Sequence, residues 1–515
     1  MSDWTAGYVA GIDYTHGYYR ELSPQILSLA VLNRALAIRA GRPFRYLELG
    51  FGQGLSFNIH AAACSGEFWG TDFNPAQAAN ARELAEASGS GARIFNLSFA
   101  EFAARDDLPE FDVIALHGIW SWISEENRSV IVDLARRKLA LGAVLYISYN
   151  CTPGWSPAIP LRHLMMLHAG LAGSDDKGIS GRIDRAIVFA QQVVDAGALY
   201  FRGNPAVVER LKNIAEQNRQ YLAHEYFNRD WEPIPFSEVA KRFAGAKLNF
   251  AASANLLDHI DACNLTTEGQ KLLAAIGHPV LRESVRDYLV SEQFRKDVFV
   301  KGALPMTSLE QLERYRDLGF VLLTRPDDIS MKLPVTVGNV TLQEKVYKPL
   351  IDALAEHNFA PKTVAELALH PSNQGRPLPQ LIEALIILTG AGHVQPAQDS
   401  EAVKLAKPRC EALNSHLLHR ARFSDDVAFL ASPVIGGGVA VGRFQQLFLL
   451  ARQTGKPQPE DWVQFAWEAI SAQGQRLLKD GRTIETAEEN LAELLVQANA
   501  FSTKRLPVLE ALGIA

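Results

Sequence analysis

The sequence predicts an α/β protein: a doubly wound parallel sheet with a helical insertion, followed by mainly helical, partly winged-helix-like C-terminal domains. Three observations predict this fold class. Short apolar runs alternate with helical patterns over residues 44–150, a glycine-rich turn follows the first of these runs, and helical periodicity dominates the remaining chain. Alternating strands and helices form βαβ units, whose strands lie parallel and are covered by helices on both faces.

Five strands are expected within residues 44–150, because five apolar runs there are separated by helical patterns. The runs are FRYLELG, EFWGTDF, ARIFNLSF, FDVIALH and AVLYISYN. Sheets of this kind bind ligands beyond the carboxyl ends of their strands, beside the first strand. The residues that form a site should therefore follow the ends of these five strands: Leu49, Phe73, Leu97, Leu116 and Tyr149.

The sheet needs two further strands, which we expect at residues 222–227 (LAHEYF) and 247–253 (KLNFAAS), with the helix FSEVAKRF between them. The stretch from about 160 to 220 has helical apolar spacing and is interpreted as an insertion between the fifth and sixth strands. The first domain would then span residues 1–255.

The remaining chain is expected to form three more domains, since a chain of 515 residues exceeds one core and domains average about 150 residues. We expect a helical domain at 256–330, a winged-helix-like domain at 331–405 and a mainly helical domain at 406–515. A DNA-reading helix presents Arg, Lys, Asn or Gln side chains to bases. In PLPQLIEALIILTGAGHVQP only Gln380 qualifies, so we interpret the winged-helix pair as a protein-interaction module.

Composition and charge indicate a globular protein without a nucleic-acid partner. Hydrophobic residues make up 48% and charged residues 21% of the chain, and 51 Lys and Arg face 57 Asp and Glu, for a net charge of −6. Proteins that bind a phosphate backbone usually carry a basic excess. The most apolar stretch, residues 381–394, is interrupted by Glu383 and is too short to cross a bilayer, so no membrane insertion is expected.

No metal site or disulfide framework is expected. The four cysteines are scattered and form no CxxC pair. The segment HEYFN (224–228) begins like a zincin helix, but Asn228 stands where the second metal-binding His would be. With no secretory signal visible at the N-terminus, these features predict a cytoplasmic location.

The turn after the first strand carries the strongest functional signal. It reads Glu48-Leu-Gly50-Phe-Gly52-Gln-Gly54 and departs from the dinucleotide fingerprint GxGxxG. Glycines allow the backbone to turn sharply and to approach a ligand closely, with helix N–H groups just behind. This ExGxGxG pattern resembles that of class I S-adenosylmethionine (SAM) methyltransferases. Asp72, at the end of the second strand, would then accept hydrogen bonds from the ribose hydroxyls, and Phe73 would lie against the adenine.

Other strand ends supply further candidates for the cofactor. Ser98 and Phe99 follow the third strand, where this fold usually binds the adenine amino group, although Ser98 is equally suited to cap the next helix. His117, after the fourth strand, is expected to bond the methionine part of the cofactor, with a role as base as the alternative. Three N-terminal tyrosines have two possible roles. Either they form a lid over the cofactor, or they belong to a hydrophobic segment that crosses the sheet edge. They are Tyr14, Tyr18 and Tyr19.

Aromatic residues after the fourth and fifth strands are the candidates for the catalytic side. Trp120 and Trp122 follow the fourth strand, and one of the two is expected to be core. A methyl sulfonium is a cation, which aromatic faces and side-chain oxygens stabilise. After the fifth strand, Tyr149 and Asn150 would orient the nucleophile, and Trp155 would exclude water.

Four segments together resemble one family, the bacterial SAM-dependent methyltransferases in which a "methyltransferase regulatory" domain follows the SAM domain. The family includes the rickettsial protein-lysine methyltransferases. The segments are ALHGIWSWISEENR (115–128), LYISYNCTPGW (145–155), HEYFNRDWEPIPFSEVAKRFAGAKLNFAASA (224–254) and VRDYLVSEQFRKDVFVKG (285–302). The resemblance covers roughly residues 10–330 and implies SAM-dependent methyl transfer and a dimeric, multidomain architecture.

The expected reaction is in-line methyl transfer to a lysine side chain of a protein or peptide acceptor. Such a displacement depends on alignment more than on acid–base assistance. A polypeptide acceptor is favoured because much folded chain follows the SAM domain. Three alternatives stay open: a small-molecule N- or O-methyltransferase, a non-catalytic SAM-binding scaffold, and a nucleic-acid base methyltransferase, which the acidic balance disfavours.

Overall fold

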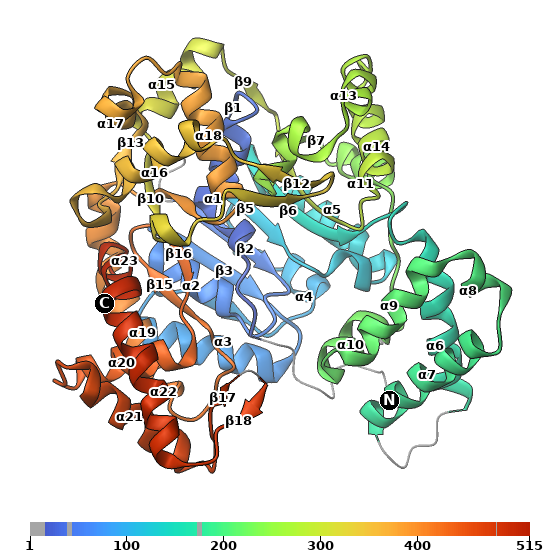
Figure 1. Ribbon diagram of the computed structural model, residues 1–515. Helices are drawn as coiled ribbons and strands as arrows, with labels where there is room; N and C mark the ends of the chain where they lie inside the picture. The colour runs from blue at the N-terminus through green and yellow to red at the C-terminus, as the bar shows by residue number, and fades with distance from the viewer. Residues whose placement is uncertain (1–15, 39–43, 173–177, 480) are drawn as a thin grey trace.

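A seven-stranded sheet forms the centre of the molecule in the computed structural model (Figure 1), which describes residues 16–38, 44–172, 178–479 and 481–515. The strand order is β4-β3-β2-β5-β6-β8-β7. All strands run parallel except β8, which is antiparallel to both of its neighbours. The strands are β2 (Arg45–Leu49), β3 (Glu67–Thr71), β4 (Arg93–Phe95), β5 (Phe111–Leu116), β6 (Leu139–Asn150), β7 (Leu248–Ser253) and β8 (Phe294–Lys301).

Helices cover both faces of this sheet, which confirms the predicted doubly wound α/β fold. Because successive strand residues point to opposite faces, Tyr46 of β2 belongs to one core and Leu47 to the other. The Tyr46 face packs against α1 (Pro24–Leu32), α2 (Leu55–Ala63) and α3 (Pro75–Ser88). The Leu47 face packs against α4 (Phe99–Ala103), α5 (Glu125–Lys138) and α11 (Phe236–Gly245).

The prediction of a strand at 222–227 is wrong. Residues 222–226 belong to helix α10 (Arg219–Tyr226), and Phe227 follows its end. Leu222, Ala223 and Tyr226 share one helical face, which is buried in an apolar core. The strand that completes the sheet is β8, which lies between β6 and β7, so the sheet ends at residue 301 and not near residue 255.

An insertion of helices follows β6 and precedes β7, as the sequence predicts. We call α6 to α10 the insertion lobe; it extends to one side of the sheet (Figure 1, teal to green). It has an apolar core of its own, which includes Leu161, Met165, Ile183 and Leu211. Its helices are α6 (Ile159–Leu171), α7 (Gly178–Asp195), α8 (Leu199–Gly203), α9 (Pro205–Glu216) and α10.

Short helices and β8 connect the sheet to the C-terminal half. These helices are α12 (Asp261–Asn264), α13 (Thr267–Ala274), α14 (Pro279–Val290) and α15 (Ser308–Asp317). Helix α14 packs against α11. The two-residue strands β1 (Leu36–Ala37) and β9 (Leu304–Pro305) pair with each other.

A three-stranded sheet with helices follows. Two of its strands lie in the predicted winged-helix-like domain (331–405), and the third lies before it, in the predicted helical domain (256–330). Strand β10 (Gly319–Leu322) lies between β13 (Lys362–Thr363) and β14 (Val394–Ala397). Helix α18 (Leu378–Gly390) buries its apolar residues, among them Leu381, Leu385 and Leu388, in the core of this region. The other elements are the hairpin β11 (Lys332–Val335) and β12 (Gly338–Thr341), and the helices α16 (Glu344–Phe359) and α17 (Val364–Leu369).

The C-terminal helices pack directly on the helical layer of the central sheet. Helix α19 (Ser400–Arg420) contacts α2 and α3, and Arg409 donates hydrogen bonds to the carbonyls of Ala62 and Cys64 at 3.2 and 2.9 Å. The last elements are the hairpins β15 (Phe429–Ser432) with β16 (Gly437–Ala440) and β17 (Leu478–Lys479) with β18 (Arg482–Thr483), and the helices α20 (Arg443–Gln453), α21 (Pro459–Ser471), α22 (Ala487–Ala500) and α23 (Leu506–Ala511).

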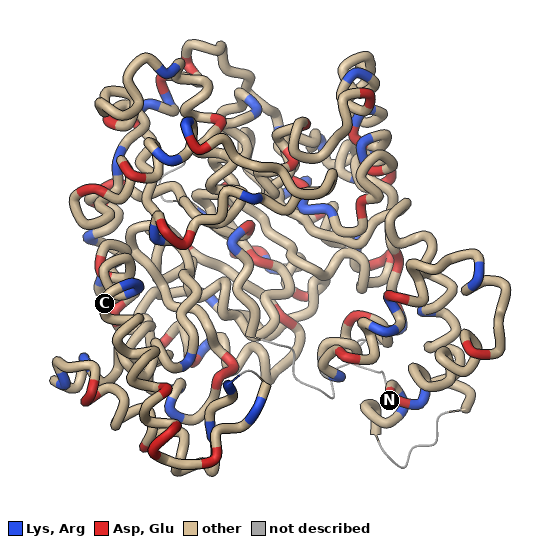
Figure 2. The backbone as a smooth tube through the Cα atoms, viewed as in Figure 1, with Lys and Arg blue, Asp and Glu red and all other residues tan. Residues whose placement is uncertain are grey.

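Charges of both signs are interspersed along the described chain (Figure 2). Within the described residues, every helix is too short or too polar to span a bilayer.

Candidate functional site

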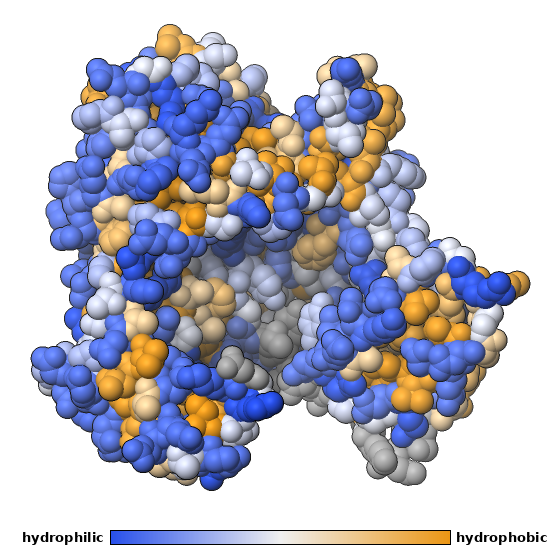
Figure 3. Space-filling model, viewed as in Figure 1, coloured by the Kyte–Doolittle hydropathy of each residue, from blue (hydrophilic) through white to orange (hydrophobic). Residues whose placement is uncertain are grey.

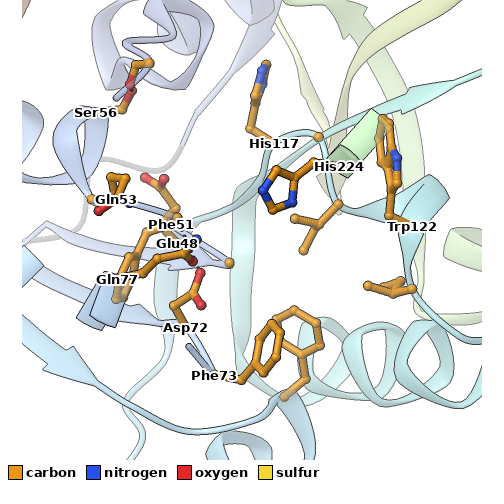
Figure 4. Close-up of a pocket in the computed structure, with 18 of the residues that line it drawn as sticks. Glu48, Phe51, Gln53, Ser56, Asp72, Phe73, Gln77, His117, Trp122 and His224 are labelled. Carbon is orange, nitrogen blue, oxygen red and sulfur yellow. Dashed lines mark hydrogen bonds between the residues drawn. The ribbon is translucent and has the colours of Figure 1, made fainter. Parts of the chain in front are cut away.

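A pocket lies at the carboxyl ends of β2, β3 and β5, where the fold predicts a ligand site (Figure 4). One side of it is formed by the glycine turn after β2 and by Asp72 after β3. The opposite side is formed by Trp122, which follows β5, and by His224 of α10. The pocket thus joins the central sheet to the insertion lobe.

The three glycines of the turn hold backbone conformations that other residues rarely adopt. Gly50, Gly52 and Gly54 have φ angles of +72°, +58° and +73°. A Cβ atom on Gly54 would lie 2.5 Å from Cβ of Ala81, and one on Gly50 would lie 3.0 Å from Ile119 Cγ2. Both backbone conformation and close packing therefore require glycine here, and Gly54 directly precedes α2, whose N-terminus faces the turn.

Asp72 is fixed beside this turn by two backbone hydrogen bonds. The N–H of Gly52 donates to Oδ2 and the N–H of Asn74 donates to Oδ1, each at 2.9 Å. Burial raises the pKa of Asp72 to about 6, although these hydrogen bonds act in the opposite direction. Carboxylate oxygens have further lone pairs, so Asp72 can accept additional hydrogen bonds from a ligand in the pocket.

Glu48 is a second buried carboxyl group in the pocket wall. The hydroxyl of Tyr46 donates to its Oε2 at 3.1 Å. Burial, with a contribution from the negative charge of Asp72, raises the pKa of Glu48 to about 8. Burial therefore favours the protonated form of Glu48 more strongly than that of Asp72, which backbone hydrogen bonds stabilise as a carboxylate.

The part of the pocket nearest to Asp72 is apolar. It is lined by Phe73, Leu97, Phe99 and Ile119. Ser98 also lines it, and its side chain accepts a hydrogen bond from the Glu101 N–H while the Glu101 carboxylate accepts one from the Ser98 N–H. The capping role of Ser98 is thus confirmed, and its contact with an adenine stays a prediction.

His117 lines the pocket as a neutral imidazole. Its Nδ1 lies 2.8 Å from the hydroxyl of Tyr146 and 3.2 Å from Oγ of Ser148. Burial lowers its pKa to about 3, and its ring stacks on Tyr19 with centroids 3.9 Å apart. A group with so low a pKa is a weak base at neutral pH, so the alternative that His117 is the base is disfavoured.

The three N-terminal tyrosines do not share one environment. Tyr14 lies outside the described residues. Tyr19 lines the pocket, whereas Tyr18 is directed toward the C-terminal helices: its hydroxyl lies 3.2 Å from Nε2 of His60 and its ring packs on Phe429. Of the described tyrosines, Tyr19 is therefore the one placed to contact a bound cofactor.

Tyr149 and Asn150, expected on the nucleophile side, do not line the pocket. Tyr149 is fully buried and donates a 2.6 Å hydrogen bond to Oδ2 of Asp297 on β8. The backbone N–H of Asn150 donates to Ser121 Oγ at 3.0 Å, and its side chain is buried. These residues are covered because β8 pairs with β6 along its whole C-terminal half.

Trp120 and Trp155 are also core residues in the structure and not part of the pocket wall. Trp120 packs on Phe243 of α11. Trp155 packs edge-to-face on Trp231, with centroids 5.0 Å apart, and Arg210 lies over its ring at 4.0 Å. Of the two tryptophans after β5, the core residue is therefore Trp120, and Trp122 faces the pocket.

The sequence did not reveal the residues that α10 and the loop after it contribute to the pocket: His224, Glu225, Asn228 and Asp230. Asn228 lies in the loop after α10, and its Nδ2 donates a hydrogen bond to the His224 carbonyl at 2.6 Å. In the sequence, the spacing of these two residues indicates no more than an incomplete zincin motif. Within the described chain, no cluster of three or more His, Cys, Asp or Glu side chains could hold a metal ion.

The fold and this pocket define a class I SAM-dependent methyltransferase, and comparisons with known proteins give the family. Residues 218–301 match the model of the predicted methyltransferase regulatory domain. An uncharacterized protein of Synechocystis sp., sll1526, is 41% identical over 99% of this chain and 100% of its own. The chain belongs to this family of SAM-dependent methyltransferases with a methyltransferase regulatory domain.

Rickettsial proteins are more distant relatives. Uncharacterized protein RP789 of Rickettsia prowazekii is 26% identical over 49% of this chain and 45% of its own. Among solved structures, PKMT2 from Rickettsia typhi in complex with AdoHcy superposes with a TM-score of 0.70 at 17% identity, over 98% of this chain and all of the other. This likeness extends the shared fold to the C-terminal helices.

Proposed function

We propose that this enzyme transfers a methyl group from SAM to a lysine side chain of a protein. The observation that carries the SAM site is the Asp72 carboxylate, which is held by Gly52 at 2.9 Å, buried, and part of the pocket wall. In this proposal its remaining lone pairs accept hydrogen bonds from the ribose hydroxyls, and the adenine lies among Phe73, Phe99 and Ile119.

The residues of the pocket fit this cofactor in charge and in shape. Among the described residues, no cation forms an ion pair with Asp72, so a ligand hydroxyl is the natural partner for its remaining lone pairs. The turn lines the pocket with backbone, because Gly50, Gly52 and Gly54 carry no side chains and hold positive φ angles. Tyr19 and His117 form an aromatic wall suited to a sulfonium cation.

SAM supplies an electrophilic methyl group, so this chain must align the acceptor and exclude water. Trp122 and His224 lie opposite the glycine turn (Figure 4), and Glu225 of α10 lines the same pocket; these residues are the candidates for this alignment. These residues replace four earlier candidates, whose side chains do not line the pocket: Tyr149, Asn150, Trp120 and Trp155.

A polypeptide acceptor is supported by the large folded surface outside the sheet. Figure 3 shows the molecule hollowed between the insertion lobe and the C-terminal helices, and α10 lies on the side of the lobe toward the sheet (Figure 1). A small acceptor would need no surface of this extent. The resemblance to rickettsial protein-lysine methyltransferases supports the same acceptor class. A homodimer in the cytoplasm is part of this proposal, and sedimentation of the purified enzyme tests the dimer.

The acceptor is tested by incubating the enzyme with methyl-labelled SAM and a lysate of its source organism. Label in protease-sensitive material, mapped to lysine by mass spectrometry, is the expected result. Label confined to small, protease-resistant molecules would replace the lysine proposal by the small-molecule alternative. An enzyme that binds SAM but labels nothing would favour the scaffold alternative.

A further inference from the structure

We propose that Glu225 is the residue that binds the acceptor's ammonium group and takes up its proton before methyl transfer. This inference rests on the proposed function, since it requires an amine acceptor. It assigns a catalytic role to the insertion lobe, because Glu225 belongs to α10 and not to the central sheet.

The position of Glu225 supports an acceptor-side role. It lines the same pocket as the glycine turn, together with its helix neighbour His224. The adenine and ribose are assigned to the region of Phe73 and Asp72, whereas α10 forms the opposite wall with Trp122 (Figure 4). A group that enters the pocket from the side of the insertion lobe would therefore meet α10 first.

In the part of the chain that the structure describes, the Glu225 carboxylate has no partner, unlike those of Asp230 and Glu232. Within the described residues, its carboxylate forms no hydrogen bond and no ion pair, whereas Glu232 pairs with Arg128 at 2.6 Å and Asp230 pairs with Arg229 at 3.1 Å. Burial alone raises the pKa of Glu225 to about 7. A partly buried carboxylate without a cation is costly, and an incoming ammonium would relieve that cost.

The other ionisable groups around α10 are less suited than Glu225 to take up the acceptor's proton. On α10 itself the neighbouring ionisable groups are Tyr221, His224 and Tyr226, and burial raises the pKa of both tyrosines well above neutrality. His117 faces the pocket from β5 with a pKa lowered to about 3. Further charged groups lie on or beside the elements around α10. Arg162 of α6 donates to the Asn228 carbonyl at 2.6 Å, Arg210 of α9 lies over Trp155, Asp184 of α7 pairs with Arg219, and Asp230 follows α10 in the pocket wall. Helix α7, which contacts α10, also carries Arg182 and Arg185.

The proton and electron balance is simple. The proton of the acceptor ammonium passes to the Glu225 carboxylate, which leaves a neutral amine and a carboxylic acid. The freed nitrogen lone pair forms the N–C bond as the C–S bond breaks, and that electron pair stays on sulfur. A base with a pKa near 7 suits this step, because a free lysine amine, with a pKa of about 10.4, is almost fully protonated at neutral pH.

The test compares Glu225→Gln with Glu216→Gln, a matched control on the exposed end of α9. Turnover is measured from pH 6 to 10 on the acceptor found with labelled SAM. We expect E225Q to lose about 100-fold in kcat at pH 7, the deficit to shrink toward pH 10 as the amine loses its own proton, and AdoHcy affinity to stay within about twofold. E216Q should match the wild type throughout.

A binding measurement tests the same residue without any acceptor. Sinefungin carries an amine on the carbon that replaces the methyl sulfonium, so its ammonium would occupy the place of the reacting groups. Calorimetry should show that E225Q lowers sinefungin affinity by at least about tenfold relative to AdoHcy, a preference of about 1.4 kcal/mol.

The outcomes separate the two proposals. An unchanged pH profile and an unchanged sinefungin preference in E225Q would overturn the role of Glu225, whatever the acceptor is. If E225Q loses AdoHcy and sinefungin affinity equally, Glu225 has a structural role, and its proposed role in proton uptake is likewise overturned. If the wild type labels only small amines, the protein-lysine proposal fails while the pH profile and sinefungin preference still decide on Glu225.

Discussion

The backbone N–H of Gly52 donates a 2.9 Å hydrogen bond to Oδ2 of Asp72, which ties the glycine turn after β2 to the acid after β3. The same carboxylate accepts a second bond from the Asn74 N–H through its other oxygen. Each oxygen thus has one fixed bond and spare lone pairs. These hydrogen bonds join the glycine turn and Asp72 into one rigid unit. The geometry of this unit is therefore set before a ligand binds.

Replacing Asp72 by Ala should remove most of the affinity for SAM. The variant loses two charge-assisted hydrogen bonds to ribose, each of which contributes about 1.5–3 kcal/mol, and also releases the Gly52 N–H. Isothermal calorimetry should show at least about a 100-fold weaker Kd. The control is Glu67→Gln at the opposite end of β3, which should bind SAM like the wild type. Undiminished affinity in D72A would refute the cofactor assignment.

AdoHcy affinity should fall as the pH drops through about 6. The pKa of Asp72 is raised to about 6 by burial, so the carboxylate ionises in the free protein as the pH rises through that value. In the proposed binding mode the ribose hydroxyls donate to the ionised form, so binding should be tight above pH 6 and should weaken by up to about tenfold per unit below it. The Kd measured from pH 5 to 7 should follow this curve in the wild type and be flat in Asp72→Asn. A flat curve in both would contradict the assignment.

Gly54→Ala should impair binding far more than Gly89→Ala. Both glycines have a positive φ, +73° and +61°, so alanine costs about 1–2 kcal/mol of conformational strain at either position. Only at Gly54 would the new Cβ also lie 2.5 Å from another atom, Cβ of Ala81, whereas Gly89 has open space. We expect G89A to lower stability alone and G54A to weaken AdoHcy binding by at least about tenfold as well. If G54A and G89A bind AdoHcy with equal affinity, the glycine turn tolerates the Cβ at position 54 and this prediction is wrong.

The cofactor half of the site could be predicted from the sequence, because its residues obey local rules. Glu48, the glycine turn and Asp72 each follow directly from a short apolar strand, and their spacing is set by one βαβ unit. The alternation of strand and helix in residues 44–150 likewise determines the order of the first five strands of the sheet. No contact between distant segments is needed for either prediction.

The part of the pocket wall that α10 forms could not be predicted, because it depends on such distant contacts. Strand β8 pairs with β6 although the insertion lobe, β7 and several short helices separate them along the chain. That pairing buries Tyr149, which otherwise has the features of a rim residue. Glu225 reaches the pocket only because the whole lobe packs back toward the sheet. The apolar periodicity of the sequence can at best predict that α10 is a helix. It does not predict which part of the molecule α10 faces.

Trp155→Ala should destabilise the insertion lobe and should not act mainly through chemistry. Trp155 is 6% exposed and packs among Trp231, Tyr226 and Arg210. Truncating a buried Trp costs about 3–5 kcal/mol. Hydrogen exchange should therefore speed up in α9 and α10, with Leu171→Ala, an exposed position on the same lobe, as the control. Lost turnover without faster exchange would restore the catalytic role that the sequence suggested.

Tyr149→Phe should lower stability while leaving cofactor affinity unchanged, which separates a structural hydroxyl from a catalytic one. The Tyr149 hydroxyl donates a 2.6 Å hydrogen bond to Asp297, whose carboxylate also accepts from Arg295 at 2.9 Å. Arg295 in turn pairs with Asp287 and Glu283, so the hydroxyl belongs to a buried charge network between β8 and α14. Removing one donor from a buried carboxylate costs about 1–3 kcal/mol. Denaturant unfolding should report this loss in Y149F, with the AdoHcy Kd and kcat each within about twofold of the wild type. A variant of full stability whose turnover is lost would instead place Tyr149 at the reacting atoms.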